Sequence, residues 1–270
     1  MFLLDVIYQF FTSPIEALPL LLFRSLFFFT LFLEGLKLFR YRQLYYGSEA
    51  MVPPDKKLDK WTTIPLRWVK RPPSYRSMCV LLLVYLFLVL LIMAGVGNRF
   101  LAIIHFIFLI GIHELSPLSL NNANNYQRVF ALLFCFFPES AISLSVVNYS
   151  QDEWVCWAGR LMQIHLSLIY FFEAAFKLRI RSWRRGTSVG YVLNNNELNI
   201  RKVEELPIAV YKLLSWGTIV VEFVLAIGLW FPRVSLVFVV IGGLMHLTFG
   251  LILPIGYFSL TMLSFLSLFL

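Results

Sequence analysis

Residues 159–193, GRLMQIHLSLIYFFEAAFKLRIRSWRRGTSVGYVL, form an apolar run that ends in a cluster of arginines. Five polar residues lie inside the run, at depths where hydrocarbon tolerates little polarity: Gln163, His165, Tyr170, Glu173 and Lys177. Gln163, Tyr170 and Lys177 recur every seven residues, which places them on one face of a helix. Glu173 and Lys177 stand four apart, in the acid-first order that favours a helical ion pair. The segment therefore predicts a membrane helix with one polar face.

This polar face has two interpretations. In the first, it belongs to a packed polar interior that forms a functional site, with Lys177 at the foot of the helix. In the second, the face only packs against neighbouring helices, and Lys177 extends its ammonium to the membrane surface. The segment alone leaves both interpretations open.

The composition of the whole chain is that of a multi-pass membrane protein. Of its 270 residues, 59% are hydrophobic and only 14% are charged, and the mean hydropathy is +0.76. Soluble domains carry about a quarter charged residues. The net charge of +8 comes from basic residues grouped between the apolar runs, a pattern typical of membrane orientation. We therefore expect the lipid bilayer as a partner and no nucleic acid.

The apolar runs predict an all-α, polytopic integral membrane bundle that forms a single domain over residues 1–270. A transmembrane helix needs about 20 residues, so residues 1–11 are expected to form a short interfacial helix instead. Pro138 is expected to kink the fourth span, because proline removes a backbone donor. We predict about eight spans, the last of them short: residues 18–39, 78–96, 100–115, 129–147, 154–178, 207–231, 234–253 and 257–270.

The basic residues predict the orientation of these spans. They concentrate in the loops 40–77 and 179–206, which fall on the same side if every run crosses once. The connections on the opposite side hold only Arg99 and Arg233. Because cytoplasmic loops carry an excess of Lys and Arg, we expect both basic loops in the cytoplasm and the N-terminus outside.

Several ionisable residues fall at matched depths on different spans. With 1.5 Å per residue, His165, Glu222 and His246 lie roughly 13–18 Å from the outer ends of their spans. By the same measure, Glu34 and His113 lie roughly 20–22 Å deep. Charged groups at such depths pair with one another or line a wet cavity.

Arg24 and His246 are each candidate partners for Glu222. For any single histidine, the alternative is a hydrogen bond that only joins two helices. We expect no metal site, because no two histidines stand four residues apart. The three cysteines form no CxxC pair and are expected to be buried free thiols.

Several motifs in a fixed order resemble the HTTM family, the membrane domain shared with vitamin K-dependent gamma-carboxylase. The resemblance covers nearly the whole chain, and the sporulation-delaying protein B family belongs to the same broad group. The motifs are Phe23-Arg24, the Tyr-Tyr-Gly-Ser…Val-Pro run at 45–53, the Asn-rich entry to the fourth span, Gln…Tyr-Phe…Lys-Leu at 163–178, Trp-x-x-Gly-Thr at 183–187, Glu222, and Gly-Leu-x-His at 243–246.

The resemblance implies that Lys177 is the base that deprotonates a quinone cofactor, vitamin K hydroquinone. Burial favours the neutral amine form of a lysine, and a nearby carboxylate favours its ammonium form. Glu173, His165, Tyr170, Glu222 and His246 complete the candidate catalytic set. The family's histidine after the Asn-Asn pair is missing here, because Tyr126 follows Asn124-Asn125.

Two functions remain open from the sequence. The first is a membrane enzyme, carboxylase-like or quinone-linked, that uses Lys177 on a lipid-soluble or peptide substrate. The second is a non-catalytic membrane partner that helps a small secreted peptide, such as a toxin, to mature or leave the cell. A transporter is disfavoured, because no inverted repeat is visible. The family's distribution indicates a bacterial inner membrane.

Overall fold

The computed structural model describes residues 2–47, 73–115, 121–143, 153–195, 206–253 and 255–270. These residues are almost entirely helical, and the two strands found among them are two residues long each. The chain forms two compact units, unit 1 (Met1–Gly159) and unit 2 (Arg160–Leu270).

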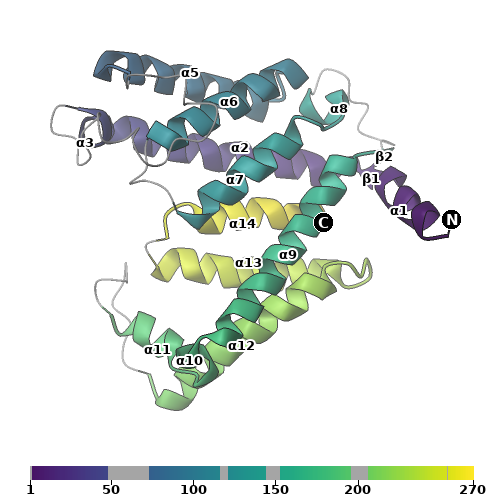
Figure 1. Cartoon of the computed structure of the whole chain (residues 1–270), viewed down its shortest axis with the longest axis vertical. Helices are drawn as coiled ribbons and strands as arrows, with labels where there is room; N and C mark the ends of the chain where they lie inside the picture. Colours follow the sequence, from purple (N-terminus) through teal and green to yellow (C-terminus); the bar gives the residue numbers. More distant parts are fainter. Residues whose placement is uncertain (1, 48–72, 116–120, 144–152, 196–205, 254) are drawn as a thin grey trace. The chain divides into compact units, whose positions relative to one another are not determined.

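Unit 1 is a helical bundle in which α2 packs on α5, α5 on α6, and α6 on α7. Its core is rich in phenylalanine rings, among them Phe23 and Phe28 of α2 and Phe134 of α7. A two-stranded antiparallel pair sets Ile15 opposite Trp154. The elements are α1 (Phe2–Thr12), β1 (Ile15–Glu16), α2 (Ala17–Arg40), α3 (Arg42–Tyr46), α5 (Tyr75–Met93), α6 (Arg99–Leu115), α7 (Asn122–Phe134), α8 (Glu139–Ile142) and β2 (Glu153–Trp154) (Figure 1).

Local signals explain where the helices of unit 1 begin and how closely they pack. The side chain of Ser74 accepts a hydrogen bond from the backbone N–H of Ser77, which caps α5. Gly35 lets α2 approach α5, because a Cβ at this position would lie 2.8 Å from a methyl carbon of Leu86. Small residues at helix contacts allow such close packing in membranes.

The fourth predicted span differs from the structure. The Asn-rich segment forms the first turn of α7, which ends at Phe134. Pro138 is the N-cap of the separate four-residue helix α8. The expected kink at Pro138 is therefore wrong, because the helix stops before the proline and a new one starts after it. Residues 144–147 of this span lie outside the described residues.

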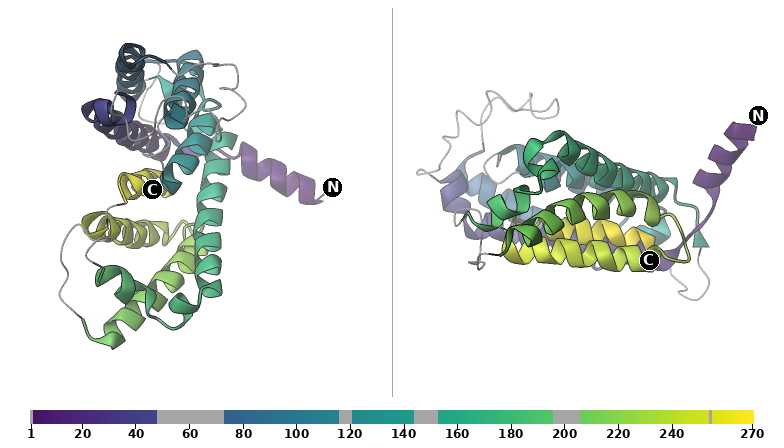
Figure 2. Two further views of the ribbon diagram at one scale, coloured as in Figure 1. Left: turned by 60° about the vertical axis from the view of Figure 1, so that its left-hand side comes forward. Right: turned by 90° about the horizontal axis from the view of Figure 1, so that it is seen from below.

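Unit 2 contains all but the first turn of α9, which starts just before the unit boundary. Among its other elements α11 packs on α12, α12 on α13, and α13 on α14, an arrangement that Figure 2 shows from two further sides. The elements are α9 (Trp157–Arg179), α10 (Arg181–Arg184), α11 (Ser188–Leu193), α12 (Ile208–Gly228), α13 (Ser235–Ile252), α14 (Phe258–Leu266) and the 3₁₀ turn η4 (Ser267–Phe269).

The first part of the predicted basic loop is folded against α12. The backbone N–H of Val189 donates to the buried hydroxyl of Ser215 over 3.1 Å. At Gly186, which has a φ of 73°, an added Cβ would lie 2.9 Å from Cα of Lys212. The loop 179–206 thus begins with packed helices, α10 and α11, while its residues 196–205 lie outside the described part of the chain.

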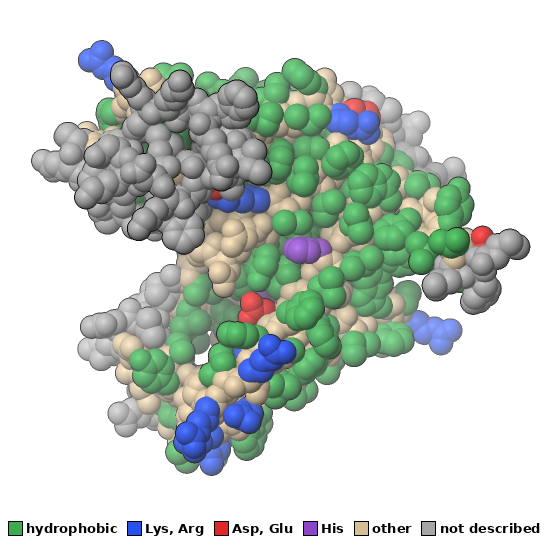
Figure 3. All heavy atoms as spheres, in the orientation of Figure 1, with side chains coloured by type: hydrophobic (Ala, Val, Ile, Leu, Met, Phe, Trp, Pro, Cys, Tyr) green, Lys and Arg blue, Asp and Glu red, His purple; other side chains and the backbone are tan. Residues whose placement is uncertain are grey.

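Five of the described helices are long and apolar enough to cross a membrane: α2, α5, α9, α12 and α13. The prediction of a helical integral membrane protein is confirmed to this extent. Most of the large apolar side chains of α13 are exposed, including Leu236, Val240 and Leu244, which suits contact with lipid. On the face shown in Figure 3, hydrophobic side chains cover much of the described surface. Residues 1–11, the expected interfacial helix, correspond to α1.

Candidate functional site

The polar face of α9 contacts three other segments of unit 2. The amide Nε2 of Gln163 donates to the carbonyl of Leu268 over 2.6 Å. The hydroxyl of Tyr170 lies 2.9 Å from Nε2 of His246 on α13. Lys177 Nζ donates to a carboxylate oxygen of α12. The heptad spacing therefore identified the side of α9 that faces the interior of unit 2.

Lys177 is held between two carboxylates. Its Nζ lies 2.8 Å from Oε1 of Glu222 and 3.2 Å from Oε2 of Glu173. It also lies 5.5 Å from the centre of the Trp183 ring, within range of a cation–π contact. The side chain of Glu222 is 7% exposed, whereas that of Glu173 is 41% exposed. The ammonium thus ends between one buried and one partly exposed carboxylate.

The ion pair joins the last turns of α9 to the second half of α12. Glu222 comes 14 residues after the first residue of α12, which is about 21 Å along the helix axis. Lys177, on the last turns of α9, meets it there, while α10 and α11 pack beside the first half of α12. The foot of α9 is therefore level with the second half of α12.

Glu222 on α12 and His246 on α13 each have one buried polar atom without a hydrogen-bond partner among the described residues. These atoms are Oε2 of Glu222 and Nδ1 of His246, whose residues are 5% and 3% exposed. Buried polar atoms in native proteins are nearly always paired, so unpaired ones call for an explanation. The rings of Phe249 and Phe258 lie about the imidazole of His246. We refer to Lys177, Glu173, Glu222, Tyr170 and His246 as the Lys177 group.

The state of His246 depends on its bond with Tyr170. If the tyrosine hydroxyl donates to Nε2, the proton of the neutral imidazole sits on Nδ1; if it accepts from Nε2, Nδ1 is an acceptor. Nδ1 can therefore either donate to or accept from a bound molecule.

The sequence did not identify the partner of Glu222. The structure pairs this carboxylate with Lys177, and neither candidate named from the sequence takes that place. Arg24 lies in unit 1, where it donates to the backbone carbonyls of Ala141 and Ile142 at the end of α8. The imidazole of His246 bonds to Tyr170.

His165 lies apart from the polar face of α9. It follows Gln163 by two residues, which turns its side chain by about 200° around the helix. The residue is half-buried. Of the predicted catalytic residues, the structure joins Lys177 to Glu173 and Glu222. It joins Tyr170 to His246 and leaves His165 on another face of α9.

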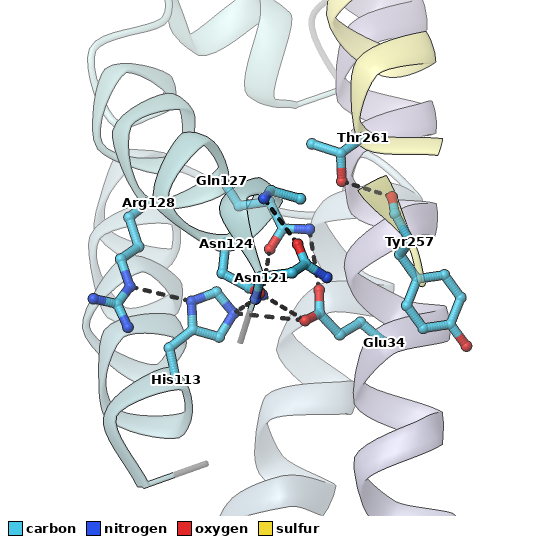
Figure 4. A network of polar contacts seen from close by, with 9 residues as sticks. Glu34, His113, Asn121, Asn124, Gln127, Arg128, Tyr257 and Thr261 are labelled. Carbon is cyan, nitrogen blue, oxygen red and sulfur yellow. Dashed lines mark hydrogen bonds and ion pairs between the residues drawn. The ribbon is translucent and has the colours of Figure 1, made fainter. Parts of the chain in front are cut away.

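Unit 1 contains a second buried polar group, drawn in Figure 4. Glu34 of α2 accepts hydrogen bonds from Asn124 over 2.6 Å and from Gln127 over 3.0 Å. His113 Nε2 lies 4.0 Å from the same carboxylate. On the other side of the imidazole, Nε of Arg128 donates to Nδ1 over 3.3 Å. A buried carboxylate is thus surrounded by neutral donors and one imidazole.

Matched depth predicted part of this second group, since Glu34 and His113 were placed at the same level. The sequence analysis missed the three α7 residues that complete it. Asn121 and Asn124 form a capping box that fixes the start of α7, and this spacing is the signal that could have placed Asn124. His113 lies 3.2 Å from the amide of Asn124.

Comparison with models of known protein families shows to which family the chain belongs. A family model described as the HTTM domain matches residues 12–270. The chain belongs to the HTTM family. This match spans both units, so both polar groups lie within the HTTM domain. No curated protein and no solved structure matches the chain.

The described residues offer little to a metal ion. In the ranges that the structure covers, no three His, Cys, Asp or Glu side chains gather closely enough to bind one. The cysteines are free thiols; Cys135 and Cys156 are buried and Cys79 is half-buried.

Proposed function

We propose that this HTTM protein is a membrane-embedded enzyme that removes a hydroxyl proton from a lipid-soluble hydroquinone at the Lys177 group. The observation that supports this most directly is Oε2 of Glu222, a buried oxygen without a partner among the described residues, in the carboxylate whose other oxygen binds the Lys177 ammonium. Nδ1 of His246 is a second buried atom without a partner in the same part of the chain. A carboxylate oxygen accepts a hydroxyl proton, and an ammonium stabilises the oxyanion that forms.

The residues of this group suit a hydroquinone of the vitamin K type. Such a molecule has a hydroxyl on each side of an apolar ring. The hydroxyls match the two polar atoms, and the apolar ring matches the phenylalanine rings near His246. Glu222 and His246 would hold the hydroxyls, and Tyr170 would orient the imidazole. Once ionised, the hydroquinone supplies a readily oxidised ring. We assign no role to His165.

Binding of vitamin K1 hydroquinone to the full chain in nanodiscs tests this proposal under anaerobic conditions. We expect the quenching of tryptophan fluorescence to saturate, and Lys177→Met and His246→Phe to weaken binding by about tenfold, the effect of one lost polar contact of about 1.4 kcal/mol. Lys212→Met, which removes an exposed lysine of the same unit, should bind as the wild type does. A wild-type protein that does not bind refutes the proposal and favours the role of a membrane partner for a small secreted peptide.

We further propose that residues 1–270 act as one domain with eight spans in a bacterial inner membrane, with both basic loops cytoplasmic and the N-terminus outside. The strand pair supports this topology, because β1 precedes the first predicted span and β2 opens the fifth, both on the outer side. The backbone N–H of Arg99, at an outer turn, also bonds to the carboxylate of Glu139, the first residue of α8.

Single cysteines in a cysteine-free background test this topology in intact cells. An impermeant maleimide should label Ser13→Cys and Asn98→Cys from outside and spare Arg42→Cys and Arg185→Cys until the membrane is opened. Labelling of Arg42→Cys and Arg185→Cys from opposite sides would refute the topology.

A further inference from the structure

Three arginines share one face of the short helical turn that follows α9. Arg181, Arg184 and Arg185 stand at i, i+3 and i+4, and residues with this spacing are neighbours on a helix surface. The backbone N–H of Arg185 donates to the carbonyl of Arg181 over 3.0 Å, so the turn includes all three. Each of them is exposed. We refer to residues 181–185 as the arginine turn; in Figure 3, Lys and Arg side chains gather at the end of unit 2 that α10 forms.

The described part of unit 2 does not balance the charge of the arginine turn. Its side-chain carboxylates are those of Glu173 and Glu222, and both bind Lys177. None of the three guanidinium groups has a hydrogen bond or an ion pair with a described residue. Like charges at this spacing repel one another. The arginine turn therefore favours an anion that lies among its side chains.

Contacts with α12 hold the arginine turn in place. The indole Nε1 of Trp216 donates to the backbone carbonyl of Arg184 over 3.1 Å. Gly186, the next residue after the turn, lies so close to α12 that an added Cβ would come within 2.9 Å of Cα of Lys212. The backbone beneath the arginines is thus ordered in advance, which lowers the entropy cost of binding an anion.

From the same place, α12 presents a row of exposed apolar side chains. Trp216, Val220 and Val224 follow one another at intervals of four, which puts them on one face of the helix. They are 48%, 57% and 41% exposed. The row extends for about 12 Å, close to half of a hydrocarbon core of about 30 Å, the length available to one acyl chain. It begins at the arginine turn, because Trp216 is bonded to Arg184.

We propose that the arginine turn and this row bind one anionic phospholipid. Its phosphate lies on the guanidinium groups, and one acyl chain follows Trp216, Val220 and Val224. Guanidinium groups bind phosphate oxygens through paired, charge-assisted hydrogen bonds, and tryptophan is a typical residue of the boundary between headgroups and chains. A soluble polyanion would use the arginines and leave the apolar row without a partner, whereas a lipid uses both. The proposal does not depend on the chemistry of the Lys177 group.

Quenching of tryptophan fluorescence by chain-brominated lipids tests this proposal. The full chain is placed in phosphatidylcholine nanodiscs that contain a small fraction of brominated phosphatidylglycerol or, for comparison, brominated phosphatidylcholine. We expect stronger quenching by the phosphatidylglycerol, and Trp216→Phe should remove most of the excess. Arg184→Gln and Arg185→Gln should each weaken the apparent affinity for phosphatidylglycerol by about fivefold, the equivalent of about 1 kcal/mol for one arginine near a membrane surface. Arg233→Gln, an exposed arginine between α12 and α13, should match the wild type.

A tryptophan further along the row tests the position of the acyl chain. Val224→Trp should add to the excess quenching by brominated phosphatidylglycerol. Val240→Trp is the matched control, because Val240 is an exposed valine of α13 at a similar distance from the turn between α12 and α13, and it should respond equally to both lipids. An equal preference at both positions would overturn the proposal.

The remaining outcomes separate a lipid from other anions. Equal quenching of the wild type by the two brominated lipids would overturn the proposal. Loss of the excess on addition of soluble glycerol phosphate would also overturn it and show a site for free phosphate. Loss of the excess on addition of a short single-stranded RNA would show a nucleic-acid site instead. An excess that survives both additions and is weakened by Arg184→Gln supports the phospholipid.

Discussion

Replacing Lys177 with methionine should strongly destabilise unit 2. The substitution keeps the apolar stem and removes the ammonium from a carboxylate that is 5% exposed. Removing one partner of a buried ion pair costs about 3–5 kcal/mol, because the remaining charge is left unpaired. In a chain of this size, where 1 kcal/mol shifts the melting temperature by about 2–4 °C, we expect Lys177→Met to lower it by about 6–20 °C.

The double variant Lys177→Met/Glu222→Met distinguishes a lost ion pair from a general packing defect. Replacing both partners of a buried pair by apolar side chains is often close to neutral, so the double variant should recover most of the lost stability. The loss in Lys177→Met should also shrink as the pH falls, because Glu222 can then take up a proton.

Thermal unfolding of the full chain in one detergent, at a fixed scan rate, measures these differences even if unfolding is irreversible. Lys212→Met, with the same change in charge, should melt within about 1–2 °C of the wild type, as surface substitutions usually do. A double variant that loses the sum of two independent single effects would refute the reasoning, because contacting partners must be coupled.

Three further substitutions and one control test the packing within each unit, all by the same thermal assay. Asn124→Ala should cost about 1–3 kcal/mol, since it leaves a buried carboxylate without its shortest hydrogen bond; stability equal to the wild type would contradict the second polar group. Gly186→Ala should destabilise by at least about 1–2 kcal/mol, because its φ of 73° is strained for any residue with a Cβ. Gly217→Ala, with open space around the added methyl, should not lose stability, and an equal loss at both glycines would contradict the close contact at Gly186. Arg128→Met should cost about 3–5 kcal/mol, because Glu114 on α6, the carboxylate partner of Arg128 at 2.8 Å, is buried. An unchanged melting temperature would show that the Arg128–Glu114 pair contributes nothing to stability.

The polar face of α9 could be predicted in detail from the sequence. Its heptad spacing is a local property of one helix, and the structure directs all three residues into unit 2. The level shared by Glu34 and His113 was also predictable, because the rise per residue is constant along a helix.

The start of α7 and its end before Pro138 were predicted less well. Hydropathy continues through residues 129–147, and nothing in it shows where backbone hydrogen bonding stops. The capping box at Asn121 and the proline turn decide these ends. Both depend on one or two residues, so hydropathy averaged over a window does not show them.

By itself the sequence determined that this chain is a helical membrane protein of the HTTM family, because hydropathy, helical periodicity and motif order are all written along the chain. Only the tertiary structure decided that Lys177 meets Glu222 at 2.8 Å and that one oxygen of this carboxylate has no partner among the described residues. The reason is physical: which side chains meet depends on how each helix is rotated and on where the next one passes. In this chain, for example, α10 and α11 pack against α12 inside a segment that hydropathy describes only as a basic loop.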